Sequence, residues 1–221
     1  MDWLARLGLP VIQHRLCRTA EEAVRAARAF APARSPDGAV AMKVVSPEIL
    51  HKTDVGGVAL GLQGEAELRA AFDRLRGLVP DDVFGGVLVT PMVLDPVEAI
   101  IGLSTDPQFG PVVAVGLGGI FAEALRDLSL RVAPVSQAEA HAMLDELRGG
   151  NILAGARGRA PRDRDALADL VSRVSRLPFE HSGIRELDLN PVFCLERGCA
   201  IADVRILSNA GSKDEQEGSL S

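Results

Sequence analysis

Hydrophobic and polar residues alternate most clearly near the C-terminal end of the chain, in the run Glu186-Leu-Asp-Leu-Asn190. Because side chains alternate between the two faces of a strand, this run predicts a β-strand with two leucines on one face and three oxygen-bearing side chains on the other. The leucines would anchor the strand in a core. A second apolar run returns over residues 199–204 with one carboxylate, Asp203, in its middle. The two runs are predicted to pair as a hairpin.

Apolar residues recur every three or four positions in four other segments, which is typical of amphipathic helices. These segments are residues 19–31, 65–78, 136–147 and 162–177. Two of them begin with a capping box, Thr19 with Glu22 and Ser136 with Glu139, in which the two side chains accept hydrogen bonds from free backbone amides. Short runs rich in Val, Ile and Leu lie between the helices and predict strands. The order of elements predicts an α+β (α/β) fold.

A connector at about residues 92–96 divides the predicted elements into two lobes. The smaller lobe covers about residues 20–91, and the larger one covers about residues 92–208, with residues 1–19 packed on it. The tail, residues 209–221, is polar and acidic, and it is predicted to be disordered.

Composition narrows the class of protein. The chain has 221 residues, of which 47% are hydrophobic and 24% are charged, as in ordinary globular proteins. Its net charge of −6 gives no basic surface for nucleic acid. No apolar run approaches the length of a membrane span, and no signal peptide is visible. The three cysteines lack metal-ligand spacing and are expected to be reduced thiols. We therefore expect a cytoplasmic protein that binds neither membranes nor nucleic acid.

The polar face of residues 186–190 has two interpretations. A half-exposed edge strand explains an E-x-D-x-N pattern without any ligand. Magnesium, however, prefers oxygen ligands and keeps substrate phosphates in its coordination shell. A second carboxylate, Asp203, on the predicted partner strand favours the metal interpretation.

Lys43 and His51 are the other residues that point to chemistry. Lys43 is the single charge in the apolar run of residues 39–45, so it either reaches an edge of the sheet or meets an anion. His51 lies on a long loop that also holds Lys, Thr, Asp and a pair of glycines. Such a histidine can act as a nucleophile or carry a proton. The glycine run at residues 116–119 lacks the spacing of a dinucleotide fingerprint and predicts a tight turn.

Four motifs together resemble one family, the ATP-grasp portion of ADP-forming acetyl-CoA synthetases (acyl-CoA synthetases, NDP-forming). The motifs are Lys43 to Val58, Asp106 to Pro111, Gly116 to Phe121 and Glu186 to Pro191. The resemblance covers about residues 2–208, and the succinyl-CoA synthetase β subunit is a more distant relative. It implies an ATP-grasp fold, in which two α+β lobes hold a nucleotide in the cleft between them.

The resemblance also assigns expected roles to particular residues. The residues expected at the nucleotide are Lys43 at the phosphates, Met92 and Val93 at the hinge, Glu98 just beyond it, and Arg131 and Arg157 near the cleft. The residues expected to bind Mg²⁺ and phosphate are Asp188, Asn190 and Asp203. His51 matches a histidine that is transiently phosphorylated and passes its phosphoryl group to ADP.

The function implied by the resemblance is that of the nucleotide-binding subunit of an acid–CoA ligase (ADP-forming). This enzyme interconverts acyl-CoA, ADP and phosphate with acid, CoA and ATP, and it uses Mg²⁺. The chain has no CoA-binding or ligase domain, so the resemblance implies an α-type partner subunit, in a heterotetramer, for the full reaction. Two alternatives are an ATP-binding regulatory module and a stand-alone ATP-grasp carboxylate ligase. The second alternative leaves the His51 loop unexplained.

Overall fold

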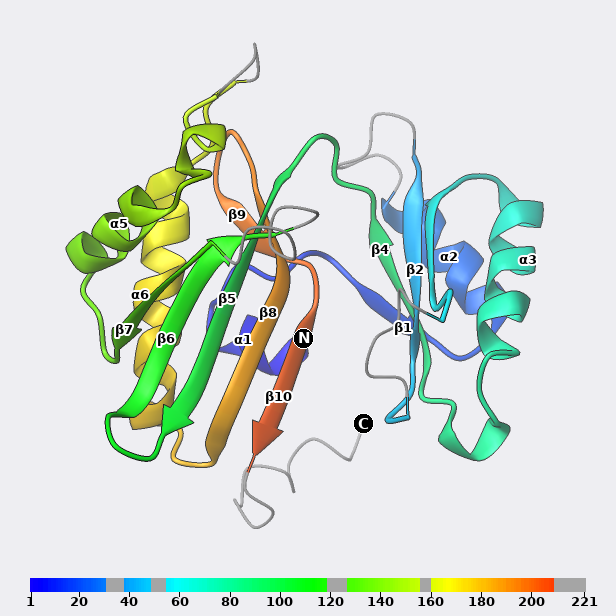
Figure 1. Ribbon diagram of the computed structural model, residues 1–221. Helices are drawn as coiled ribbons and strands as arrows, with labels where there is room; N and C mark the ends of the chain where they lie inside the picture. Colours follow the sequence, from blue (N-terminus) through cyan, green and yellow to red (C-terminus); the bar gives the residue numbers. More distant parts are fainter. Residues whose placement is uncertain (31–37, 49–54, 119–126, 156–159, 209–221) are drawn as a thin grey trace. The chain divides into compact units, whose positions relative to one another are not determined.

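The computed structural model describes residues 1–30, 38–48, 55–118, 127–155 and 160–208 (Figure 1). The chain divides into two compact units, one formed by Ile12–Leu94 and the other by Met1–Val11 together with the residues from Asp95 onward. Each unit is an antiparallel sheet with helices packed on one face. The expected α+β architecture is therefore confirmed.

The smaller unit is built on a four-stranded sheet in the order β1-β4-β2-β3. Its strands are β1 (Arg15–Cys17), β2 (Val40–Val45), β3 (Val58–Leu62) and β4 (Gly86–Pro91), and its helices are α2 (Ala20–Phe30), α3 (Glu65–Arg76) and the short 3-10 helix η1 (Asp81–Val83). Alternate residues of β2, among them Met42 and Val44, are fully buried against α2 and α3. The unit begins at Ile12 rather than near residue 20, because β1 pairs with β4.

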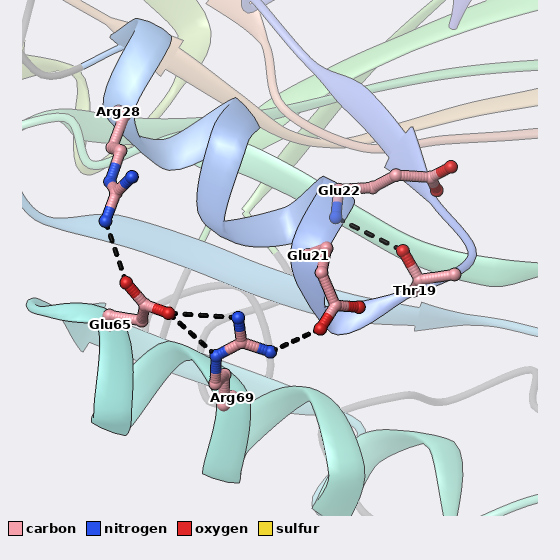
Figure 2. A network of polar contacts seen from close by, with 6 residues as sticks. All are labelled: Thr19, Glu21, Glu22, Arg28, Glu65 and Arg69. Atoms are coloured by element: carbon pink, nitrogen blue, oxygen red, sulfur yellow. Dashed lines mark hydrogen bonds and ion pairs between the residues drawn. The ribbon is translucent and has the colours of Figure 1, made fainter.

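Polar contacts set the start of α2 and join it to α3 (Figure 2). The Thr19 hydroxyl accepts a hydrogen bond from the Glu22 amide at 3.2 Å, as the capping box predicts. On the exposed side, Arg69 donates to Glu21 at 2.6 Å and to Glu65 at 3.0 Å. The hydrogen bond from Arg69 holds the pKa of the Glu21 carboxyl below its ordinary value. These exposed contacts link the two helices, which pack on the sheet through their buried apolar residues.

The larger unit is built on a six-stranded antiparallel sheet in the order β10-β8-β5-β6-β7, with β9 also paired to β8. Its strands are β5 (Val97–Asp106), β6 (Gly110–Leu117), β7 (Leu128–Val132), β8 (Ile184–Cys194), β9 (Cys199–Ile201) and β10 (Val204–Ser208). Its helices are α1 (Asp2–Arg6), α5 (Gln137–Glu146), the 3-10 helix η2 (Gly150–Ile152) and α6 (Arg164–Glu180). Helices α5 and α6 cover one face of this sheet (Figure 1), and the core lies between them and the sheet.

Local sequence explains where the elements of the larger unit begin and turn. Ser136 and Glu139 form the expected capping box at the start of α5. Asp163 caps α6 by accepting from the Ala166 amide, and its other oxygen accepts from the Gly198 amide at 2.7 Å. Asp163 thereby ties α6 to the β8–β9 turn. Asp106 accepts from two amides in the β5–β6 turn, which has the predicted turn chemistry.

The hairpin that carries Asp203 differs from the prediction. Residues 199–204 do not form one continuous strand, because β9 ends at Ile201 and β10 begins at Val204. The interruption lies opposite Pro191, which has no amide hydrogen to donate to the ladder. The Pro191 carbonyl still accepts from the Ala202 amide at 3.0 Å. Asp203 therefore lies between two strands rather than in the middle of one.

The cysteines and the helices bear on two expectations drawn from composition. All three cysteines are free and buried. Cys194 and Cys199 lie opposite each other in the β8–β9 register, and burial raises the pKa of each to about 12, which keeps both protonated at neutral pH. Within the part of the chain that the structure describes, no helix is long and apolar enough to cross a membrane.

The two faces of β8 give a direct stability test. Leu189 is fully buried, whereas Glu186 on the same strand is exposed. We expect Leu189→Ala to lower the free energy of unfolding by roughly 2–5 kcal/mol, because it leaves a cavity in the core. The matched control Glu186→Ala should change it by less than about 0.5 kcal/mol. Urea unfolding measures both, and equal midpoints for the two variants would contradict this account of β8.

Candidate functional site

The larger sheet has one face covered by helices and one open face, and β8 presents polar residues on the open one. Opposed residues in the strand register form a row across five strands, namely Leu130, Ala114, Gly102, Asp188 and Arg205. The adjacent row consists of Arg131, Val113, Leu103, Leu187 and Ile206. Val113, Leu103 and Leu187 are buried under the helices. Because neighbouring residues of a strand face opposite sides, the row that contains Asp188 lies on the open face.

A hollow of about 270 Å³ lies on this open face. Its lining includes small residues, Gly102 and Ala114, and charged residues at one side, Asp188 and Arg205. A Cβ added at Gly102 would meet the Ala114 Cβ at 3.8 Å, which is an ordinary contact. The glycine is therefore not required by packing, and its lack of a side chain keeps the hollow open.

The three expected metal ligands lie together beside this hollow. Asp188 and Asn190 are exposed, and they alternate with the buried residues Leu187 and Leu189, as the sequence predicts. The Asn190 amide donates to the Asp203 carbonyl at 3.3 Å, so these two residues are opposed across the hairpin. The Asp203 carboxylate accepts a hydrogen bond from the Val204 amide at 2.9 Å. Backbone pairing thus brings two carboxylates and one amide side chain to the same part of the sheet.

Electrostatics at Asp188 favour a bound cation. Partial burial raises the pKa of the Asp188 carboxyl, Arg205 opposes this shift, and the negative charge of Asp203 adds to it. A cation near both carboxylates would stabilise their charged forms. Among the described residues no three His, Cys, Asp or Glu side chains gather closely enough to hold a metal. Two carboxylates and an amide still fit Mg²⁺, which usually takes one or two carboxylates and completes its shell with water and substrate phosphates.

Two other candidates in the larger unit, Glu98 and Arg131, lie on opposite faces of its sheet. Glu98 lies on β5 between the buried residues Val97 and Ala99, so its side chain is on the open face with Asp188. Its carbonyl accepts from the Gly118 amide at 2.7 Å. A Cβ at Gly118 would come within 3.0 Å of the Glu98 Cβ, so glycine allows this close approach.

Arg131 lies on the opposite side of the sheet. It is adjacent to the buried Val113 in the register, and its guanidinium forms an ion pair with Glu146 of α5. It also donates to the Ser129 hydroxyl at 3.5 Å. The hydrogen bond from Arg131 lowers the pKa of the Glu146 carboxyl. Arg131 is therefore not brought together with Asp188, and its contacts join β7 to α5.

Three candidates belong to the smaller unit. Lys43 is half-buried on β2, where its neighbours Met42 and Val44 are buried under the helices. Lys43 therefore lies on the face of the sheet away from α2 and α3. The Met92 amide donates to the Ala39 carbonyl at 3.0 Å, which extends the pairing of β4 with β2 by one residue. Val93 follows it, and the boundary between the units falls two residues later, at Asp95.

The remaining candidates, His51 and Arg157, lie outside the described residues.

Arg205 is a site residue that the sequence reasoning missed. It lies directly opposite Asp188 and lines the hollow beside it. A signal was present, because Asp203 and Arg205 are two residues apart and such residues share a face of a strand. The sequence alone does not show that Arg205 faces Asp188, because the partner of Arg205 depends on the register of β10 against β8.

A second missed residue is Arg162, whose side chain is only 5% exposed. It donates to both the carbonyl and the carboxylate of Asp95 at 2.8 Å. Asp95 has a φ of +47°, a conformation that non-glycine residues seldom adopt. This ion pair holds the first residue of the larger unit after the connector.

Comparisons with known proteins give a consistent result. A family model described as "ATP-grasp domain" matches residues 1–207. The acetate–CoA ligase (ADP-forming) I subunit beta of Pyrococcus furiosus is 40% identical over 204 residues, which cover 90% of this chain and 85% of that subunit. The acetate–CoA ligase (ADP-forming) I of Archaeoglobus fulgidus is 46% identical over 172 residues. That match covers 76% of this chain but only 25% of the Archaeoglobus protein, so this chain corresponds to a part of it.

A protein of known structure is similar over nearly the whole chain. It is the dinucleotide-forming acetyl-coenzyme A synthetase 1 of Ca. Korarchaeum cryptofilum. Its complex with coenzyme A, Ca-AMPCP and HgCl⁺ has a TM-score of 0.85 at 40% identity and covers 94% of this chain and 90% of that one. Another complex of the same protein, with coenzyme A and Mg-AMPPCP, has a TM-score of 0.78 at 39% identity and covers 94% and 89%. In that complex a phosphohistidine segment points towards the nucleotide-binding site.

The raised pKa of Asp188 predicts how stability depends on pH. A folded-state pKa above the ordinary value of 3.8 means that the folded protein loses stability as pH rises through the two values. Asp188→Asn should therefore melt at a higher temperature than wild type at pH 7. The gain should be on the order of 1–2 °C, because the carboxyl is also partly exposed.

Thermal melts between about pH 3 and pH 7 test this prediction. The difference between Asp188→Asn and wild type should vanish near pH 3, where the carboxyl is protonated in both states. Asp82→Asn, which changes an exposed aspartate of the smaller unit, serves as the matched control. A lower melting temperature for Asp188→Asn at pH 7 would show that the charge at this position stabilises the fold.

Proposed function

The chain belongs to the ATP-grasp domain family, among the beta subunits of ADP-forming acetate–CoA ligases, as its motifs predicted, and on this premise we propose that it is the nucleotide-binding subunit of such a ligase. The enzyme would interconvert acyl-CoA, ADP and phosphate with acid, CoA and ATP. The observation that carries this proposal is the open face of the larger sheet, where Asp188, Asn190 and Asp203 gather beside a hollow. Loss of these ligands would be expected in a regulatory module that no longer binds Mg²⁺–nucleotide.

The smaller unit would hold the base and part of the phosphate chain. We assign the adenine to the backbone of Met92 and Val93, with Glu98 just beyond them, and the phosphates to Lys43. The placement of Lys43 on the helix-free face of β2 supports this assignment, since its ammonium then faces away from the apolar core. Pairing of Met92 with Ala39 supports it too, because it fixes the connector to the strand that carries Lys43. Arg157 is assigned to the same nucleotide site from its motif, whereas Arg131, which pairs with Glu146 of α5 on the covered face, is not assigned to it.

Asp188, Asn190 and Asp203 would hold Mg²⁺. When bound, the ion would neutralise charge on the phosphoryl group in transfer. The protein's own contribution is to fix the two carboxylates by strand pairing, so that little reorganisation is needed when the nucleotide arrives. Lys43 would add a second positive charge to the phosphate chain.

His51 would carry the phosphoryl group between two sites. A ring nitrogen of neutral His51 would attack the phosphorus of an acyl phosphate formed from acyl-CoA and phosphate on the partner subunit, the bond between phosphorus and the acyl oxygen would break, and the acid would leave as its carboxylate. In the second step a β-phosphate oxygen of ADP attacks the same phosphorus, the N–P bond breaks and ATP forms. The loop that carries His51, with its paired glycines Gly56 and Gly57, supports this assignment.

The full reaction would require a partner. We infer an α-type subunit with the CoA-binding and ligase domains, assembled with this chain as a heterotetramer in the cytoplasm. The relation to both a separate beta subunit and a part of a longer ligase supports this inference. The ATP-grasp domain would extend to about residue 208. Recognition of the acid would then belong to the partner.

Phosphorylation of His51 is the direct test of the proposed function. On incubation with γ-labelled ATP and Mg²⁺, the wild-type chain should acquire label that is lost in acid and kept in base, as expected of a phosphohistidine. His51→Ala should lose at least about nine-tenths of this label. His141→Ala, which changes a histidine paired with Asp165 on the surface of α5 and α6, is the matched control and should retain it. Absence of label in wild type, or equal label in both variants, would refute the proposed role.

A further inference from the structure

Arg205 has no role in the function described above, yet its position is specific. It projects from β10 on the open face of the larger sheet, directly opposite Asp188. It lines the same hollow as Asp188 and is exposed there. None of the ion pairs found among the described residues involves Arg205, so its guanidinium is not committed to a structural salt bridge there.

We propose that Arg205 binds the phosphates of the nucleotide, and that its guanidinium serves as the counter-ion of Asp188 and Asp203 until Mg²⁺–nucleotide arrives. In the free protein the guanidinium partly balances the two carboxylates. When the carboxylates bind the metal, Arg205 turns to the terminal phosphates. The inference rests on the proposed function, because it places the phosphates on this face of the sheet.

The charges of Arg205 and the two expected metal ligands favour such a change of partner. The Asp188 and Asp203 carboxylates together carry a charge of −2. One divalent cation already matches that charge, so these two carboxylates cannot balance a divalent cation and the guanidinium at the same time. A metal at Asp188 and Asp203 therefore repels the adjacent guanidinium. The group that lies close to both cations and attracts both is the phosphate chain of the nucleotide. Arginine suits this position because its planar fork can donate two hydrogen bonds to one phosphate.

The neighbourhood of Arg205 leaves room for this contact. The row that it ends continues through Asp188 to Gly102 and Ala114, which carry no large side chains. Glu186, two residues before Asp188, is on the same face and also lines the hollow. An arginine on one side therefore offsets a face that is otherwise acidic. Without it, the approach of a polyphosphate to Glu186 and Asp188 would be repulsive.

The test compares Arg205→Ala and Arg205→Lys with a matched control, Arg185→Ala. Arg185 is an exposed arginine on β8 that does not line the hollow. Two affinities are measured for the folded chains: Mn²⁺ alone, by electron paramagnetic resonance, and ATP at saturating Mg²⁺, by calorimetry. Circular dichroism and thermal melts confirm that each variant is folded.

The proposal predicts changes of opposite sign. Arg205→Ala should bind Mn²⁺ alone about 3- to 10-fold more tightly, because a nearby positive charge is removed. It should bind Mg²⁺–ATP about 10- to 100-fold more weakly, because a charged hydrogen bond to phosphate is lost. Arg205→Lys should keep wild-type Mn²⁺ affinity and recover only part of the ATP affinity. Arg185→Ala should change neither value.

Each other outcome overturns the inference in a distinguishable way. If Arg205→Ala weakens both affinities, its role is structural. If Mn²⁺ binding tightens while ATP binding is unchanged, Arg205 is a counter-ion only and not a phosphate ligand. If wild type binds ATP and Arg205→Ala matches it in both measurements, Arg205 has no role while the proposed function stands. If wild type itself binds no nucleotide, the proposed function and this inference fail together.

Discussion

Burial of one face of β8 is the constraint on which the candidate site depends. Leu187 and Leu189 are almost completely buried, at 1% and 0% exposure. Because the side-chain period of a strand is two, this burial forces Asp188 and Asn190 to the open face. A slip of one residue in register would expose both leucines and bury the polar groups, which is strongly unfavourable. The hydrophobic core therefore positions the polar residues without touching any ligand.

Electrostatics on the open face work against stability and in favour of binding. Burial raises the pKa of Asp188, and Asp203 adds to the shift, so the folded chain holds these charges at some cost. Arg205 offsets part of that cost. In the proposed site the carboxylates would bind a divalent cation and the arginine would bind phosphate. The same groups explain why nucleotide and metal would bind together rather than separately.

Sequence reasoning predicted the features that depend on local physics. The alternation of β8, the capping boxes at Thr19 and Ser136, and the β5–β6 turn all follow from a few neighbouring residues. It failed where the outcome depends on distant pairing. The run that carries Asp203 is broken because of Pro191 on the opposite strand. β7 does not turn its large apolar side chains toward the core, as an amphipathic strand usually does. Its leucines are on the open face and Arg131 is turned to Glu146 of α5.

The metal and the phosphates of the nucleotide are proposed to bind on the open face of the larger sheet. Broadening of backbone amide NMR signals by Mn²⁺–ADP, with Mg²⁺–ADP as the diamagnetic reference, tests it most directly. We expect strong broadening at Gly102, Asp188 and Asn190, and weak broadening at Leu170 in α6 on the covered face. Broadening centred on α6, or spread evenly over the larger unit, would contradict it.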